Sequence, residues 1–187
     1  MTWNITLFDA INGLAAHTVA LNPVIAAFAL WGGPVLLVLI LGVAWWRHRD
    51  RYVTAVLTGI AAFAALGVNQ LVAALWFEPR PFVALHGVTV LLAHPADDSF
   101  PSDHAVIAGA LALGTLLLAR RWGIVAVVVA LLLAFTRVYA GMHYPLDVLA
   151  GLAIGAVVAL VVVGCGGRVA ARIVERYRSR SAELADR

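Results

Sequence analysis

The chain has 187 residues, of which 63% are hydrophobic and 12% are charged, and its formal net charge is +3. This composition excludes an ordinary water-soluble domain and is typical of a single-domain integral membrane protein. It also argues against a nucleic-acid partner, because the thirteen basic residues, all arginines, border apolar runs instead of forming one solvated face.

Residues 1–22 are predicted to form an N-terminal interfacial helix. Trp3, Leu7, Ile11 and Leu14 recur at helical spacing with polar residues between them, which favours a helix lying in the membrane interface over a short span. The segment lacks a basic start and a cleavage site, so we do not expect a removable signal peptide. The single Cys165 excludes an internal disulfide.

Residues 23–167 are predicted to form the transmembrane core of an all-α, polytopic membrane bundle of five to six helices. A span needs about 20 apolar residues, and the expected spans, with a kink at Gly32-Gly33-Pro34 in the first, are 23–46, 52–77, 105–119, 122–136 and 148–167. The third and fourth are shorter than a bilayer core, which places Asp103, His104 and Arg137 in a polar pocket below the surface. Gly151 and Gly155 in the last span predict close helix packing.

Counting through these spans places eleven of the thirteen arginines on one membrane face, including the basic tail at 168–187. The positive-inside rule makes that face cytoplasmic, so we expect a multi-pass protein of the plasma membrane. The remaining polar residues of interest fall on the opposite, extracytoplasmic face, and they are Arg80, Ser102, Asp103, His104, Arg137, His143 and Asp147.

The connection 82–100 is apolar in its first half and polar in its second, which predicts a lid in the interface. His86 and His94 are interpreted as lid residues and not as metal ligands, because no paired carboxylate or histidine spacing accompanies them. Asp97 and Asp98 are expected in a solvated loop, with a divalent ion bridging them to a diphosphate as the alternative.

Two arginines and a serine at a helix start indicate a site for phosphate oxygens. Arg80 and Arg137 supply permanently charged forks, and Ser102 with the following backbone N–H groups adds donors where the helix dipole is positive.

Two histidines extend this site from binding to catalysis. A neutral His143 imidazole could attack phosphorus to give a phosphohistidine, and His104 could protonate the departing oxygen. Asp147 lies four residues after His143 and, if Pro145 begins a helix, can hold the other ring nitrogen of His143. The structural alternatives are an interfacial anchor for Arg80, a helix cap for Asp147 and a polar first-turn residue for His104.

The order of these residues resembles the three-part signature of the type 2 phosphatidic acid phosphatase family. The motifs are Arg80-Pro81, then Pro101-Ser102-Asp103-His104, then Arg137 followed by His143 and Asp147. The resemblance implies an all-helical, metal-independent membrane phosphatase that needs no cofactor. It implies His143 as nucleophile, Asp147 as its orienting residue, His104 as general acid, and Arg80, Arg137 and Ser102 as phosphate-binding residues.

Two positions depart from the family pattern. Asp103 stands where glycine is usual, and we group it with the phosphate-binding residues, with a helix-start charge as the alternative. Ala73 stands where the first motif often begins with lysine, and the chain contains no lysine. Asn69, Gln70 or a neighbouring histidine could replace that lysine.

Arg80-Pro81-Phe82 together with the second motif is similar to the bacitracin-resistance branch, which removes a phosphate from undecaprenyl diphosphate. The partner expected is therefore a lipid phosphate within the membrane, and the sequence leaves open whether the chain forms a homodimer. The first alternative is a phosphatase of another lipid phosphate, such as phosphatidic acid or phosphatidylglycerol phosphate. The second is a noncatalytic protein that binds or transports lipid phosphates.

Overall fold

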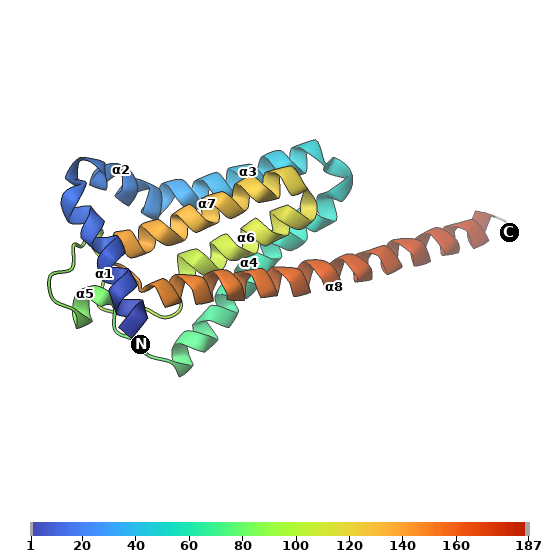
Figure 1. The fold of residues 1–187 in the computed structure, drawn as a ribbon. Helices are drawn as coiled ribbons and strands as arrows, with labels where there is room; N and C mark the ends of the chain where they lie inside the picture. Colours follow the sequence, from blue (N-terminus) through green and yellow to red (C-terminus); the bar gives the residue numbers. More distant parts are fainter. Residues whose placement is uncertain (1, 186–187) are drawn as a thin grey trace.

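The computed structural model describes the backbone of residues 2–185, the side chains through Val169 and that of Arg172. The described chain is a helical bundle from which the C-terminal helix projects (Figure 1). In chain order the helices are α1 (Thr2–His17), η1 (Val19–Leu21), α2 (Asn22–Ala27), the π-helical turn η2 (Phe28–Gly32), α3 (Gly33–Arg47), η3 (Arg49–Arg51), α4 (Tyr52–Leu75), α5 (Pro81–Ala84), α6 (Asp103–Leu118), α7 (Arg120–Tyr139) and α8 (Pro145–Ala185).

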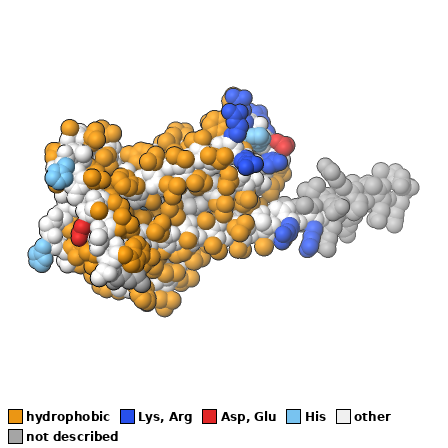
Figure 2. Space-filling view, viewed as in Figure 1, with side chains coloured by type: hydrophobic (Ala, Val, Ile, Leu, Met, Phe, Trp, Pro, Cys, Tyr) orange, Lys and Arg blue, Asp and Glu red, His pale blue; other side chains and the backbone are white. Residues whose placement is uncertain are grey.

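Four helical segments of the described chain are long and apolar enough to cross a membrane, namely Val19–Arg47, Arg49–Leu75, Arg120–Tyr139 and Pro145–Val169. Together with the shorter apolar helix α6 they confirm the predicted polytopic all-α bundle. Large apolar side chains such as Phe63 and Leu75 are more than 80% exposed, and hydrophobic atoms cover the visible face (Figure 2). Such a surface suits lipid and not water.

Helix α6 packs against α3, α4, α7 and α8, and so forms the centre of the bundle (Figure 1). Its contact with α8 depends on small residues. A side chain at Gly151 would approach the Ser102 carbonyl oxygen to 2.8 Å, and one at Gly155 would collide with the Val106 carbonyl. The close packing predicted from these glycines is therefore present, and it brings the start of α6 against the start of α8.

Helix α1 packs on α7 and α8. Asn4 and Asn12 are buried, whereas Trp3 and Leu7 are more than 40% exposed. Asn12 Nδ2 donates to the carbonyls of Thr89 and Tyr139, and Asn4 Oδ1 accepts from a backbone N–H at the start of α8. Asn4 and Asn12 thus bind backbone groups of the bundle, on the same side as the buried Phe8, while Trp3 and Leu7 face outward.

The helices also bear on two sequence predictions, the kink in the first span and the basic tail. The predicted kink in the first span coincides with the π-helical turn η2, which ends at Gly32, directly before Gly33-Pro34. Helix α8 is continuous through residue 168, where the basic tail was expected to begin. Arg176, Arg178, Arg180 and Arg187 of that tail lie outside the side chains that the structure describes.

Candidate active site

A cavity of about 360 Å³ opens at the end of the bundle where α4 and α7 finish and α6 begins. Its walls come from α4, from the connection that follows it, and from the facing ends of α6 and α7. Five of the seven predicted site residues line it, and they are Arg80, Asp103, His104, Arg137 and His143. Ser102 and Asp147 are completely buried behind this lining.

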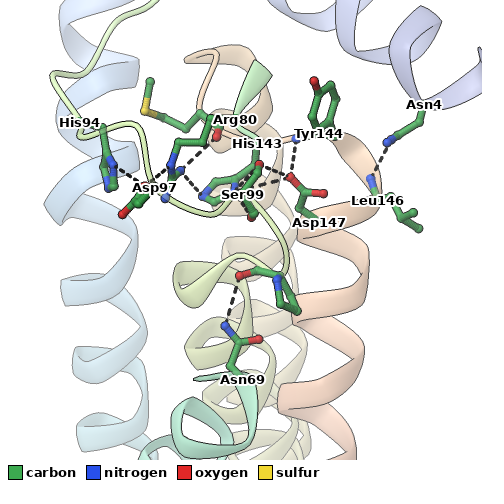
Figure 3. Close-up of polar contacts among 12 residues, drawn as sticks. Asn4, Asn69, Arg80, His94, Asp97, Ser99, His143, Tyr144, Leu146 and Asp147 are labelled. Atoms are coloured by element: carbon green, nitrogen blue, oxygen red, sulfur yellow. Dashed lines mark hydrogen bonds and ion pairs between the residues drawn. The ribbon is translucent and has the colours of Figure 1, made fainter. Parts of the chain in front are cut away.

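His143 lies in the turn between α7 and α8, and its ring is fixed by Ser99 of the connection between α5 and α6 (Figure 3). The turn includes Gly141, whose φ of 79° favours glycine and whose missing side chain leaves room for the Thr89 carbonyl. His143 Nδ1 lies 2.8 Å from the Ser99 carbonyl oxygen. Because a carbonyl only accepts, Nδ1 carries the hydrogen and Nε2 keeps its lone pair.

Asp147 acts on His143 less directly than expected. Asp147 Oδ2 lies 3.7 Å from His143 Nδ1, beyond hydrogen-bond distance. It accepts instead from the Ser99 hydroxyl at 2.5 Å and from the Tyr144 backbone N–H at 2.8 Å (Figure 3). The second bond is a helix-capping interaction, so the capping alternative is realised alongside the link through Ser99. Ser99 therefore lies between His143 and Asp147. Its backbone carbonyl accepts from His143 Nδ1, and its hydroxyl donates to Asp147 Oδ2.

The second ring nitrogen of His143, Nε2, lies next to Arg80. His143 Nε2 lies 3.3 Å from Arg80 Nη1, which also donates to the Met142 carbonyl at 3.1 Å. Burial, together with the positive charges of Arg137 and Arg80, holds the pKa of His143 well below its ordinary 6.5. The imidazole is therefore neutral at physiological pH, as a nitrogen nucleophile requires.

Arg80 is not free in this structure, because Asp97 binds it. Arg80 Nε donates to Asp97 Oδ1 at 2.6 Å, and His94 Nδ1 lies 3.4 Å from the same oxygen (Figure 3). The Asp97 side chain is 53% exposed, as a solvated loop predicts, and its pairing with Arg80 is an additional contact. Partial burial acts to raise the pKa of Asp97, but the hydrogen bond and charge of Arg80 outweigh it and lower the pKa below 3.8.

Arg137 is the second cation of the cavity, and only 2% of its surface is exposed. Among the described residues no carboxylate forms an ion pair with it, and its Nε has no hydrogen-bond partner. A buried guanidinium without an anion is costly. The cavity thus offers an anion an unpaired charge-assisted donor beside His143.

Asp103 occupies the side of the cavity formed by α4. Its Oδ1 accepts from Asn69 Nδ2 at 2.7 Å and from Gln70 Nε2 at 3.0 Å. The two amides considered as substitutes for the absent lysine are therefore engaged with a carboxylate. Ala73, where that lysine is usual in the family, also lines the cavity.

The remaining predicted residues differ in their access to the cavity. His104 is partly buried and lines it, whereas the Ser102 hydroxyl is buried without a hydrogen-bond partner. The Ser102 N–H donates to the Asp147 carbonyl at 3.3 Å, which ties the start of α6 to α8. Among the described residues no group of three His, Cys, Asp or Glu side chains is placed to hold a metal ion.

Sequence reasoning missed two residues of this arrangement. Ser99 carried no signal beyond its position just before the second motif, since a serine in a polar loop has many ordinary roles. Asp97 was considered only as a solvated acid or a metal contact. An unpaired Arg80 at the edge of a membrane was the available clue that an acid in the lid would meet it.

Comparison with known proteins places this geometry among membrane phosphatases. Residues 52–170 match the PAP2 superfamily. Undecaprenyl-diphosphatase BcrC of Bacillus subtilis is 34% identical over 155 residues, which cover 83% of this chain and 80% of that protein. Decaprenylphosphoryl-5-phosphoribose phosphatase of Mycobacterium tuberculosis is 35% identical over 136 residues, or 72% of each chain. The crystal structure of Aquifex aeolicus LpxE superposes with a TM-score of 0.72 at 26% identity, covering 88% of this chain and 96% of that one.

Proposed function

The chain belongs to the PAP2 superfamily of membrane phosphatases, and we propose that it hydrolyses undecaprenyl diphosphate to undecaprenyl phosphate and inorganic phosphate. This reaction would recycle a lipid carrier for cell-wall synthesis and confer bacitracin resistance.

The observation that carries the proposal is the pairing of a neutral imidazole with an unpaired buried cation. His143 presents an unprotonated Nε2, which accepts from Arg80 Nη1 at 3.3 Å, and Arg137 lines the same cavity without a carboxylate partner among the described residues. A phosphate held by Arg137 and Arg80 would face the nucleophile, while the fixed positive charges stabilise the negative charge of the transition state. A purely structural role explains neither feature.

The first chemical step forms a bond between His143 Nε2 and the terminal phosphorus of the substrate. The bond from that phosphorus to the bridging oxygen breaks, and its electron pair stays on the undecaprenyl phosphate that leaves. Burial and the positive charge of Arg137 lower the pKa of His104 to about 4. The negative charge of a bound diphosphate favours the protonated form, and His104 in that form would give its proton to the departing oxygen. The Ser99 carbonyl, which accepts from Nδ1–H, stabilises the positive charge that develops on the ring.

The second step hydrolyses the phosphohistidine. His104, now neutral, takes a proton from a water molecule whose oxygen attacks the same phosphorus. The bond from phosphorus to Nε2 breaks, which restores the neutral His143 and releases inorganic phosphate. Asp147, through Ser99, keeps the ring in one orientation during both steps.

A membrane lipid is the substrate class that suits the surroundings of the cavity. Trp76 and Phe77 follow α4 beside the cavity wall, and each is more than 60% exposed. Val83 of α5 is also half-exposed. These apolar side chains would contact the prenyl tail while the diphosphate enters the polar cavity. The name of the Bacillus subtilis relative supports the diphosphate as headgroup.

The side of the membrane is part of the proposal. The cavity lies at the opposite end of α6 from the arginine-rich end of the bundle, where Arg47, Arg51, Arg120 and Arg121 gather. The positive-inside rule would place those arginines in the cytoplasm and the cavity on the extracytoplasmic side of the plasma membrane.

A second candidate substrate is a polyprenyl-linked phosphate monoester. The relative from Mycobacterium tuberculosis, whose name specifies such a substrate, is 35% identical over a shorter match of 136 residues. The same two steps would apply, with an alcohol oxygen as leaving group. This chemistry depends more strongly on protonation by His104, because an alkoxide is a poorer leaving group than a phosphate.

Phosphate release by the purified protein distinguishes these substrates. Undecaprenyl diphosphate, a polyprenyl phosphate monoester, phosphatidic acid and phosphatidylglycerol phosphate are compared in detergent with a chelator present. The proposal expects the highest kcat/KM with undecaprenyl diphosphate, and preference for another lipid would reassign the substrate while keeping the phosphatase. If folded protein released phosphate from none of them, a binding or transport role would replace the enzymatic one.

A further inference from the structure

A second and larger cavity lies at the other end of the bundle. Its volume is about 780 Å³, and its lining includes Arg47, His48, Arg51, Arg120 and Arg121. These residues come from the end of α3, the turn η3 and the start of α7. Helix α6 separates the two cavities by its 16 residues, or about 24 Å at ~1.5 Å per residue. The second cavity is therefore not part of the phosphatase site.

The charge around this cavity is unbalanced. No carboxylate is among its lining residues, and no ion pair involves its four arginines within the part of the chain whose side chains are described. Asp50 is the adjacent acid on η3, and it does not line the cavity. Figure 2 shows a group of blue side chains, with a red acidic one beside it, at this end of the bundle. Four guanidinium groups around one hollow attract a phosphate strongly.

The backbone around this cavity contributes both signs, since α3 and α6 end there and α7 begins there. Arg51 Nη1 donates to the Leu118 carbonyl at 3.1 Å, which anchors one guanidinium at the C-terminal end of α6. Helix α7 begins at Arg120, and no side chain caps its first turn. The unsatisfied N–H groups of that turn and the positive end of the helix dipole therefore lie beside the arginines.

The other side of the cavity is apolar and continues onto the outer surface of the bundle. Leu118, Ala119, Trp122 and Val125 complete the lining, and Val125 is 45% exposed. Trp45 and Trp46 are at least half exposed at the same end, where tryptophan marks the membrane interface. A ligand there would meet arginines at its head and hydrocarbon-facing side chains below. A free phosphate would contact only the arginines and not the apolar side chains.

We propose that this cavity binds the headgroup phosphate of an anionic phospholipid of the surrounding leaflet. The lipid sits at the junction of α3, η3 and α7 with its phosphate among the arginines and its acyl chains along Val125. It is a structural or regulatory lipid, distinct from the substrate, and its binding does not require catalysis.

The test measures lipid binding to the full-length protein in detergent by native mass spectrometry, with dioleoylphosphatidylglycerol as the anionic probe and dioleoylphosphatidylcholine as the zwitterionic one. Arg120→Gln/Arg121→Gln removes two charges from the cavity. Arg168→Gln/Arg172→Gln removes two exposed charges from α8 that do not line it. Since each arginine near a lipid surface strengthens binding severalfold, we expect the first variant to bind phosphatidylglycerol about tenfold more weakly or worse, and the second to bind like wild type.

Four further readouts complete the test. Phosphatidylcholine should bind equally to all forms, and inorganic phosphate should not displace phosphatidylglycerol from wild type. Arg47→Gln, introduced alone, should weaken phosphatidylglycerol binding in the same direction, and melting temperatures without lipid should match wild type. Equal losses in both double variants, or no loss in either, would overturn the proposal by showing general charge attraction or a different site. Displacement by inorganic phosphate would also overturn it, in favour of a soluble anion.

Discussion

The Ser99 hydroxyl donates a 2.5 Å hydrogen bond to Asp147 Oδ2, and both side chains are completely buried. The carbonyl of the same serine accepts from His143 Nδ1, so one residue joins the carboxylate to the proposed nucleophile. Partners that orient metal-bound histidines matter about tenfold to a hundredfold for activity, and we expect a similar order for this orienting contact.

Replacing Ser99 by alanine should lower kcat by about tenfold to a hundredfold with little change in KM. The backbone carbonyl that fixes His143 is retained, but Asp147 loses its nearest donor and the ring is held less firmly. Steady-state kinetics with a chelator present measures kcat and KM separately. Thr115→Val is the matched control, because it removes a buried hydroxyl that binds only a carbonyl of its own helix. Equal activity of the Ser99 variant and wild type would contradict a positioning role.

Asp97→Asn should tighten phosphate binding severalfold. The Asp97 carboxylate holds Arg80 Nε at 2.6 Å and therefore competes with substrate for this cation. Its lowered pKa keeps it ionised at neutral pH, so the competition persists under physiological conditions. The observable is KM, together with inhibition by inorganic phosphate. Asp98→Asn controls for the loss of one charge in the same loop, and a raised KM in the Asp97 variant alone would show that Asp97 positions Arg80 for substrate.

Asp103→Asn should also lower KM severalfold, but with little effect on melting temperature. Asparagine keeps an oxygen that can accept from Asn69 and Gln70, while it removes a negative charge from the cavity that receives phosphate. Kinetics and thermal unfolding of the same preparation separate the two effects. A KM that rises while the melting temperature stays constant would assign the carboxylate a direct part in handling water or diphosphate.

His143 should titrate below its ordinary pKa of 6.5 in the folded protein. Burial and the two arginines disfavour its charged form, so the neutral nucleophile should persist below pH 6.5 and be lost only on further acidification. Because the unfolded chain takes up this proton near pH 6.5 and the folded chain does not, stability also falls as pH drops below that value. NMR of ring-labelled histidine, with His143→Gln to assign the resonance, measures the titration. A His143 pKa at or above 6.5 would contradict the account.

The architecture and much of the site could be predicted from the sequence because their signals are local in the chain. Uncharged runs give the spans directly, and Arg80, His104, Arg137 and His143 belong to short motifs at helix ends. Because consecutive spans cross the membrane in alternate directions, counting them is enough to predict that those helix ends lie on one side of the bundle.

The missed contacts depend on information that spacing does not carry. Ser99 and Asp97 meet their partners through the path of an irregular connection, which is determined by packing. The direction in which the polar residues of α1 point could not be predicted for another reason. Lipid surrounds this bundle, so Asn4 and Asn12 turn inward to bind backbone groups, whereas an amphipathic pattern is usually interpreted with its polar face outward.

The most direct test of the central claim is to trap the phosphoenzyme. Undecaprenyl diphosphate labelled in its terminal phosphate is mixed with purified protein and chelator, and the reaction is quenched in alkali within a single turnover. The account predicts an acid-labile, alkali-stable label on the peptide that contains His143, formed in wild type and absent from folded His143→Ala. Rapid phosphate release by the His143→Ala variant, or a wild-type label on any other residue, would contradict it.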